Sequence, residues 1–338
     1  MASRLTRFGN DLYTGARSFD FVGKRKIWYA IAIVMVVLSI LVPIVKGGFN
    51  FSIEFRGGSQ FQITNVSNTN TTKAQNAVTS VVPDAVSHVS VVGRDAVQVQ
   101  TDQLSESQTK EVADALATAY GVDAADVSST FIGPSWGADV TQQSIQGLVV
   151  FLLLAFIAMA LYFRTWKMSA AAIISLFHDL IITAGIYALV GFEVSPATMI
   201  GFLTILGYSL YDTVVVFDKI RENTREELDL TRRTFAESVN LAVNQTLVRS
   251  INTAVVAVLP VASILFIGAY ALGAATLRDI SLAQLIGIIV GTNSTIFLAA
   301  PMYSQFREGE AAIKKHDQKV RSIRPKAAKP PVAAVGAE

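Results

Sequence analysis

Apolar residues gather in long runs along this chain, and six of the runs are long enough to cross a bilayer as helices, which takes roughly 20 residues. The runs are Ile27–Val45, Ile145–Phe163, Met168–Val190, Pro196–Phe217, Ile251–Leu272 and Ile280–Met302. The first is too long and begins too late for a cleaved signal peptide. The pattern therefore predicts a polytopic α-helical membrane protein, with one transmembrane helix over 27–45 and five more within 145–302.

Residues 46–144, between the first two runs, follow shorter periods. Residues 51–55 alternate before Gly57-Gly58, which predicts an extended segment that resumes over 61–63. The elements that follow are a helix over 72–82, a hairpin of strands over 86–92 and 96–101, a helix over 105–120 capped by Ser105, and a strand over 127–132. The order β-α-β-β-α-β predicts a small ferredoxin-like α+β domain. We expect a binding or spacer role for it, because no catalytic pattern lies within it.

Composition narrows the class of protein. The chain has 338 residues, of which 51% are hydrophobic and 16% charged, against about 25% charged in ordinary soluble domains. It has no cysteine, which excludes disulfides, thiolate metal sites and cysteine nucleophiles. It also has no Walker motif and no HExxH motif, so nothing indicates ATP hydrolysis or zinc proteolysis. We expect no enzyme activity, no cofactor and no metal.

The basic residues predict the orientation, since lysine and arginine concentrate on the cytoplasmic side of membrane proteins. With the N-terminus inside, 22 of the 28 are cytoplasmic, whereas segment 46–144 has five basic and ten acidic residues. That segment is therefore expected to be extracytoplasmic and both termini cytoplasmic. The cytoplasmic parts would be an N-terminal arm over 1–26, a loop over 218–249 and a basic, disordered tail over 303–338.

Two of these cytoplasmic parts suggest surface contacts. The loop contains a weakly amphipathic stretch, Phe235–Val248, which we expect to lie at the membrane surface. The basic tail is expected near anionic lipid of the bilayer. A nucleic-acid or ribosome contact of the tail is the less favoured alternative, so we expect no nucleic-acid partner.

Asp212 is the principal candidate for function. It lies inside the apolar run 206–217, and a carboxylate at bilayer depth costs several kcal/mol, so such residues usually face a bundle interior and have a function. Helical spacing puts Thr204, Tyr208, Tyr211 and Asp212 on one face. We expect this face to line a polar interior.

Polar residues of other spans are candidate partners of Asp212. His178 and Asp179 are neighbours in the third span and point about 100° apart, so only one is expected to face Asp212. Arg249 precedes the fifth span and stays protonated. Asn252 and Asn293 are possible supporting residues. The hypothesis is a proton or ion relay in which Arg249 is the counter-charge of Asp212.

Structural alternatives stand beside this hypothesis. His178, Asp179 and Asp212 can form hydrogen bonds or ion pairs that only hold helices together. Arg249 can extend its charged end to the membrane interface without joining a relay. The spacing of Gly287 and Gly291 predicts a close helix–helix contact.

Several stretches resemble the SecF family of protein-export membrane proteins. Residues 206–223, from Leu206-Gly207-Tyr208 to Arg221-Glu222-Asn223, are similar to the family signature. The further stretches that resemble the family are 50–58, 177–179, 245–250, 276–279 and 287–294. The resemblance covers roughly 20–310. It departs from the family pattern at Tyr211, where asparagine is common, at Glu54, where aspartate is common, and in a slightly longer loop before Arg249.

The resemblance implies one half of an RND-type machine in the bacterial plasma membrane. The expected partners are SecD, the SecYEG channel and an unfolded preprotein, which the proton motive force helps to draw outward. Asp212 and Arg249 would be the proton-pathway aspartate and arginine. Two other functions stay open: an RND-type exporter of lipids or small molecules, for which segment 46–144 is small, and a subunit that only stabilises a translocon.

Overall fold

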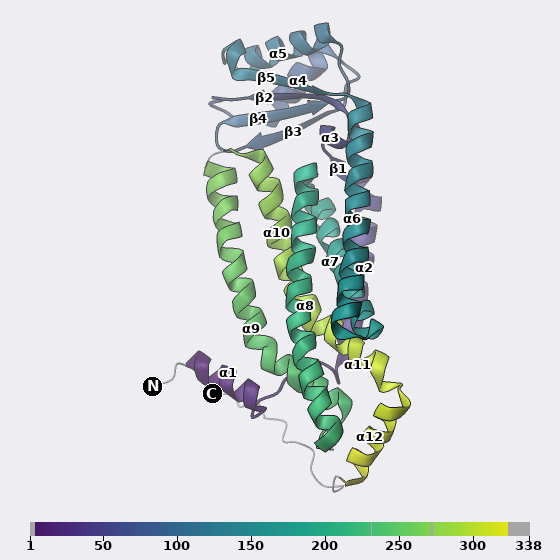
Figure 1. The fold of residues 1–338 in the computed structure, drawn as a ribbon. Coiled ribbons are helices and arrows are strands. Elements are labelled where there is room, and N and C mark those ends of the chain that lie inside the picture. The colour runs from purple at the N-terminus through teal and green to yellow at the C-terminus, as the bar shows by residue number, and fades with distance from the viewer. Residues whose placement is uncertain (1–3, 231, 272, 324–338) are drawn as a thin grey trace.

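A computed structural model describes residues 4–323 of the chain except 231 and 272. Within this part, six helices are long and apolar enough to cross a membrane, by length and composition, and they form one bundle with a small sheet domain at one end (Figure 1). The helices are α2 (Arg25–Lys46), α6 (Pro134–Phe163), α7 (Trp166–Val190), α8 (Pro196–Leu230), α9 (Phe235–Ser263) and α10 (Ala275–Ser294). The six predicted apolar helices are confirmed.

Two of the long helices are extended or broken by π-helical turns. The segment η2 (Ile264–Ala271) follows α9, and η3 (Thr295–Ala299) joins α10 to α11 (Ala300–Glu308). Pro301 has no backbone N–H to offer the preceding turn, which is consistent with a change of hydrogen-bonding pattern at that point.

The connection predicted over 218–249 is mostly helical, because both flanking helices extend into it. Helix α8 continues to Leu230 and α9 begins at Phe235. Thr234 caps α9 with a capping box: Glu237 N–H donates to Thr234 Oγ1 at 3.4 Å, and Thr234 N–H donates to Glu237 Oε2 at 2.9 Å. The stretch Phe235–Val248 forms the first half of α9. Its apolar side is buried in the bundle core, where Phe235 and Val239 are 2% and 0% exposed.

The predicted disorder of the tail is wrong for residues 303–323. Helix α11 reaches Glu308, and α12 (Ala311–Ile323) follows it. Ile313 and Val320 of α12 are buried, and His316 Nε2 lies 3.0 Å from the Arg233 carbonyl oxygen. An apolar side of α12 thus packs on the protein, which a count of basic residues does not reveal. Residues 324–338 lie outside the described residues.

The N-terminal arm packs against α9. It begins with helix α1 (Arg4–Thr14), and the segment after it is held by two asparagines of α9. Asn244 Oδ1 accepts a hydrogen bond from Phe19 N–H at 2.7 Å, and Asn240 Oδ1 accepts one from Phe21 N–H at 2.8 Å. Both α1 and α12 therefore belong to the end of the bundle opposite the sheet (Figure 1).

The sheet domain has four antiparallel strands in the order β3-β4-β2-β5. Helices α4 and α5 cover one face of this sheet, and the short η1 leads into the last strand (Figure 1). The elements are β2 (Gly58–Ile63), α4 (Thr71–Val81), β3 (Ser87–Val92), β4 (Ala96–Thr101), α5 (Glu106–Tyr120), η1 (Ala124–Asp126) and β5 (Val127–Ile132). The predicted hairpin, both helices, the Ser105 cap and the last strand are confirmed.

The segment over 51–55 is not extended as predicted. A two-residue strand β1 (Asn50–Phe51) pairs in parallel with β6 (Glu193–Val194), and a short helix α3 (Ile53–Arg56) follows. Gly57 and Gly58 then reverse the chain into β2 with φ angles of 78° and 139°, which favour glycine. A Cβ on Gly58 would also meet the Thr101 carbonyl oxygen at 2.3 Å. The sequence pattern located this break correctly but missed the helical turn before it.

Close packing of α8 on α10 positions the polar interior of the bundle. A Cβ on Gly287 would lie 2.1 Å from Ile205 Cδ1, and a Cβ on Gly291 would lie 3.0 Å from Ser209 Oγ. Glycines on one helix therefore let the other approach, as the sequence predicts and as is usual between transmembrane helices.

Candidate functional site

Helix α8 carries three polar residues on its buried face. Ser209, Asp212 and Thr213 are 1%, 4% and 1% exposed, and spacings of three and four residues place them side by side on the helix. Each points to a different neighbour, namely α7, α9 and η3. The face of α8 that holds Asp212 is therefore a polar seam through the bundle.

The Asp212 carboxylate has one hydrogen bond from a side chain. Ser250 of α9 donates to Asp212 Oδ1 at 2.9 Å, and Oδ2 is buried with no hydrogen-bond partner among the described residues. Burial of a charged carboxylate without full hydrogen bonding is costly. The free oxygen can carry a proton without breaking the bond to Ser250.

A second buried carboxylate lies beside the first. Asp179 of α7 is 1% exposed. Its Oδ2 accepts a hydrogen bond from Ser209 at 2.8 Å, and its Oδ1 lies 3.1 Å from His178 Nδ1. Since Ser209 precedes Asp212 by one helical turn, Asp179 and Asp212 occupy neighbouring levels of the same seam. Of the two neighbours in α7, Asp179 is the one that contacts α8.

The third contact of the seam is between hydroxyl groups. Thr213 Oγ1 lies 2.9 Å from Thr295 Oγ1, at the first residue of η3. π-Helical turns inside helices are frequent at functional sites. The seam thus joins α8 to three neighbours. Ser209 contacts Asp179 of α7, Asp212 contacts Ser250 of α9, and Thr213 contacts Thr295 of η3.

The predicted aromatic stripe does not lie in this seam. Tyr211 is 55% exposed, Tyr208 is half-buried and Thr204 is exposed. Tyr211 is one residue from Asp212, so its side chain points about 100° away, while Gly287 and Gly291 bring α10 against the Ser209 side. Tyr211 and Thr204 therefore lie on exposed sides of α8, and the expectation that they line a polar interior stays a prediction.

The predicted partners of Asp212 on α9 and α10 are also exposed. Arg249 immediately precedes Ser250 but is exposed, and it forms no ion pair with Asp212 within the described part of the chain. Asn252 and Asn293 are exposed too, and the Asn293 amide donates to its own helix at Ile289 O. The structure joins Asp179 and His178 to the seam and leaves Arg249, Asn252 and Asn293 outside it.

Sequence reasoning missed the hydroxyl residues that contact the carboxylates. These residues are Ser209 and Ser250. It also missed Thr213, whose hydroxyl contacts that of Thr295. The positions of Ser209 and Thr213 could have indicated their role from the sequence. Ser209 lies three residues before Asp212 and Thr213 lies one after it, so both hydroxyls are on or next to the face of the helix that carries the carboxylate. No group of three or more His, Asp or Glu residues is arranged to hold a metal ion in the described ranges.

Comparisons with known proteins identify the family of this chain. Residues 111–309 match the family model of the protein-export membrane proteins SecD and SecF, C-terminal part, and residues 44–64 match the SecD/SecF GG motif, which contains Gly57 and Gly58. The chain belongs to the SecD/SecF family. The resemblance seen in the sequence is thereby confirmed.

Full-length relatives agree with the family match. The chain is 42% identical to protein translocase subunit SecF of Streptomyces coelicolor, over 95% of this chain and 86% of the relative. It is 41% identical to SecF of Mycobacterium tuberculosis, over 93% of this chain and 72% of the relative. A third relative, SecDF of Thermus thermophilus, is 32% identical, over 84% of this chain and 38% of that longer protein.

Solved structures agree with the fold of this SecD/SecF family member. The crystal structure of Thermus thermophilus SecDF superposes with a TM-score of 0.74 at 30% identity, over 86% of this chain. A crystal structure of SecDF in a super-membrane-facing form gives a TM-score of 0.61 at 28% identity, over 90% of this chain. This chain spans 39% and 40% of those two longer chains.

Proposed function

We propose that this chain is a SecF-type subunit of a bacterial protein-export machine in the plasma membrane. Relatives named protein translocase subunit SecF align over nearly the whole chain. The SecDF relative is more than twice as long, which supports a separate SecD protein as the partner that supplies the other half. The SecYEG channel and an unfolded preprotein are the further partners of the proposal.

Asp212 is the proton-carrying group of the proposal. The observation that supports it is a buried carboxylate with one oxygen bonded to Ser250 and the other without a protein partner among the described residues. A proton that crosses about 150–200 mV releases roughly 3.5–4.6 kcal/mol, which is comparable to the free-energy gap between two conformations of a protein. Protonation of Asp212 can therefore shift such an equilibrium.

The exposed polar residues near Asp212 fit a surface for the partner. Arg249, Asn252, Tyr211 and Asn293 line the exposed sides of α8, α9 and α10. We assign Arg249 as the counter-charge of Asp212 in the assembled complex, with Tyr208, Tyr211, Asn252 and Asn293 as supporting groups. His178 and Asp179 extend the pathway on the buried side.

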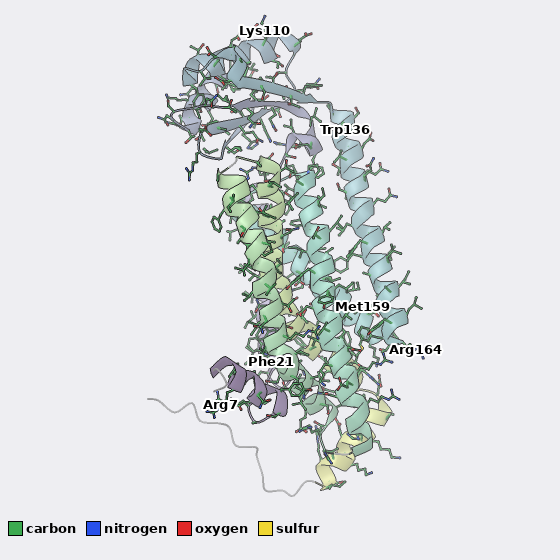
Figure 2. The ribbon with its side chains drawn as sticks, turned by 60° about the vertical axis from the view of Figure 1, so that its left-hand side comes forward. Arg7, Phe21, Lys110, Trp136, Met159 and Arg164 are labelled. Carbon is green, nitrogen blue, oxygen red and sulfur yellow. The ribbon has the colours of Figure 1, made fainter. Side chains whose placement is uncertain are left out.

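The proposed orientation places the sheet domain outside the cell. Lys110 marks the sheet end of the molecule, while Arg7 and Arg164 lie at the opposite end (Figure 2). The excess of basic residues at that opposite end supports a cytoplasmic location. The strand order and antiparallel pairing support a ferredoxin-like extracytoplasmic domain over 46–144, since its elements follow the order β-α-β-β-α-β.

The test is preprotein export that depends on the proton motive force, measured in membrane vesicles. Asp212→Asn keeps the volume of the side chain and removes the proton site, so we expect the force-dependent stimulation to be lost. Asp218→Asn is the matched control, because Asp218 lies on the same helix and is exposed. If Asp212→Asn assembles normally and exports like the control, the subunit is structural and the proton role is wrong.

Copurification tests the partner. A tagged chain should retain SecD and channel subunits through mild detergent extraction. Their consistent absence, with a lipid or small molecule retained instead, would favour the exporter alternative.

A further inference from the structure

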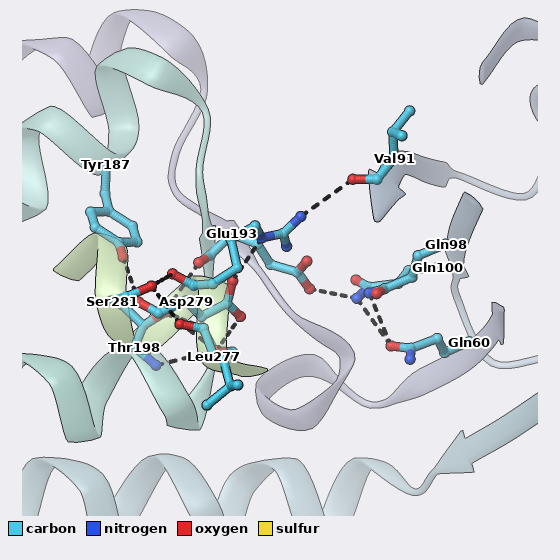
Figure 3. A network of polar contacts seen from close by, with 12 residues as sticks. Gln60, Val91, Gln98, Gln100, Tyr187, Glu193, Thr198, Leu277, Asp279 and Ser281 are labelled. Carbon is cyan, nitrogen blue, oxygen red and sulfur yellow. Dashed lines mark hydrogen bonds and ion pairs between the residues drawn. The ribbon is translucent and has the colours of Figure 1, made fainter. Parts of the chain in front are cut away.

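The sheet domain turns a polar, uncharged face towards the helix bundle. Gln60 of β2 pairs in register with Gln100 of β4, and Gln62 pairs with Gln98. Gln98 and Gln100 are 6% and 4% exposed, and both amides donate to Gln60 Oε1 at 3.2 Å. The amides form a connected row (Figure 3). Helices α4 and α5 cover the other face of the sheet (Figure 1).

One carboxylate of the bundle contacts this row. Glu193 Oε1 accepts a hydrogen bond from Gln100 Nε2 at 2.5 Å (Figure 3). Glu193 lies in β6, between α7 and α8, and is tied to β1 by strand pairing. A second contact joins Arg278 of α10 to the Val91 carbonyl oxygen of β3, at 3.5 Å. Glu193 is thus a link between the sheet and helices α7 and α8.

Arg278, whose positive charge acts on Glu193, forms its ion pair with a different carboxylate, that of Asp279. Arg278 Nε donates to Asp279 Oδ1 at 3.2 Å, and Ser195 donates to Asp279 Oδ2 at 2.8 Å. The Tyr187 hydroxyl of α7 donates to the Asp279 carbonyl oxygen. Glu193 is therefore held by a neutral amide, while Asp279 has the guanidinium.

The other charged or titratable groups around Glu193 come from the remaining elements. Glu54 of α3 adds negative charge, as Asp279 does, and Arg278 adds positive charge. His88 of β3 pairs in register with Gln100, and its pKa is lowered by burial and by Arg56. His88 is therefore mostly neutral near pH 7, so it does not supply a fixed counter-charge.

We propose that Glu193 is a proton-binding site, separate from Asp212, whose protonation keeps the sheet domain docked on the bundle. Burial raises the pKa of Glu193 to about 7, and the negative charges of Asp279 and Glu54 add to this effect against the Gln100 hydrogen bond. In an undocked state the carboxyl meets water and its pKa returns towards about 4.5. The docked state therefore binds the proton more tightly, so docking is favoured below pH 7 and weakens as pH rises through 7.

The test measures docking directly in the full chain, reconstituted in lipid nanodiscs. Because the chain has no cysteine, spin labels at Lys110→Cys on α5 and Thr276→Cys on α10 report one distance across the junction. Both positions are exposed. We expect one short distance at low pH and a growing population of longer distances at high pH. The ratio of docked to undocked protein should fall by about tenfold or more between about pH 5.5 and 8.5.

Variants assign the transition to Glu193. Glu193→Gln mimics the protonated acid and should stay docked across the whole pH range. Gln100→Leu removes the donor and should reduce docking at every pH, whereas Gln62→Leu, on the same face in the next row, should leave the transition unchanged. Glu54→Gln removes a neighbouring negative charge and should lower the midpoint.

Two results would overturn the proposal: a wild-type distance that does not change with pH, or a Glu193→Gln variant that titrates like wild type. Asp212→Asn should titrate like wild type, because Asp212 lies within α8 and not in β6 or at its contact with the sheet. The outcome is therefore independent of whether Asp212 supports export.

Discussion

Serine hydroxyls donate to both buried carboxylates of the seam, and within the described part of the chain neither carboxylate is paired with a lysine or an arginine. Ser250 donates to Asp212 and Ser209 donates to Asp179. A hydroxyl can donate to a carboxylate and can also accept from a carboxylic acid, whereas a guanidinium can only donate. Serine is therefore a partner for both protonation states of an aspartate. By contrast, the carboxylate of Glu308, the last residue of α11, forms an ion pair with Arg25 at 2.6 Å.

A serine-to-alanine pair tests the strength of these bonds. Ser209→Ala should lower the free energy of unfolding by roughly 0.5–1.5 kcal/mol, the usual range for hydrogen bonds between transmembrane helices. Ser175→Ala, on α7, is the matched control, since Ser175 is also buried but has no hydrogen-bond partner for its hydroxyl among the described residues. Thermal unfolding in detergent checks both. Equal losses for the two variants would show that Ser209 contributes volume only.

The residues of the site divide by how visible they are in the sequence. Asp212, His178 and Asp179 stand out because placing an ionisable side chain in an apolar run costs free energy. Ser250 does not, since its partner lies on another helix. Helical spacing gives the direction of Tyr211 relative to Asp212 around α8, but it does not give which direction faces α10. That choice depends on Gly287 and Gly291 across the interface.

At the scale of elements, the contact between α8 and α10 fixes the seam. Gly287→Ala should destabilise the protein by roughly 1–3 kcal/mol, because its Cβ would lie 2.1 Å from Ile205 Cδ1 and overpacking costs that much. Gly207→Ala is the control: Gly207 lies in α8, with nothing within 4 Å of an added Cβ. Thermal unfolding compares the two variants.

A second substitution tests whether the clash is with Ile205. The double variant Gly287→Ala with Ile205→Ala should recover much of the stability lost by Gly287→Ala alone, because the truncated side chain leaves room for the new methyl group. If the double variant loses the sum of the two single effects, the steric explanation is wrong.

Helix α12 supplies another test at this scale. Ile313 is 1% exposed and Ile323 is 60% exposed. Ile313→Asp should release α12 from the bundle, because it buries an unpaired charge, while Ile323→Asp should be nearly neutral. Hydrogen exchange of residues 311–323 checks this prediction. Equal protection in both variants would mean that α12 is held by other contacts.

The errors in placing the ends of the long helices have one cause. Apolar runs located every spanning helix, but α8, α9 and α11 continue beyond their apolar runs as helices with one buried side. Phe235 and Val239 then pack on the bundle and Ile313 packs on the protein. A hydropathy pattern marks where a helix meets an apolar environment, and it does not mark where helical hydrogen bonding stops. Tertiary packing decides the latter.

At the scale of the whole molecule, the distribution of charged residues follows the two ends of the bundle. Helices α1 and α12 lie at one end and the sheet domain at the other (Figure 1), with Arg7 and Arg164 at the end of α1 and α12 (Figure 2). The segment with more acidic than basic residues is the one that contains the sheet. This asymmetry is what the positive-inside rule requires of a sheet domain that is exported.

Cysteine labelling tests that orientation, since the parent chain has no cysteine and gives no background. Ser107→Cys lies on α5 of the sheet domain and Ser322→Cys lies on α12, and both positions are exposed. In intact spheroplasts, a membrane-impermeant maleimide should label Ser107→Cys and not Ser322→Cys. After permeabilisation it should label both, which shows that both thiols are reactive. Labelling of Ser322→Cys before permeabilisation would reverse the proposed orientation and place the sheet domain in the cytoplasm.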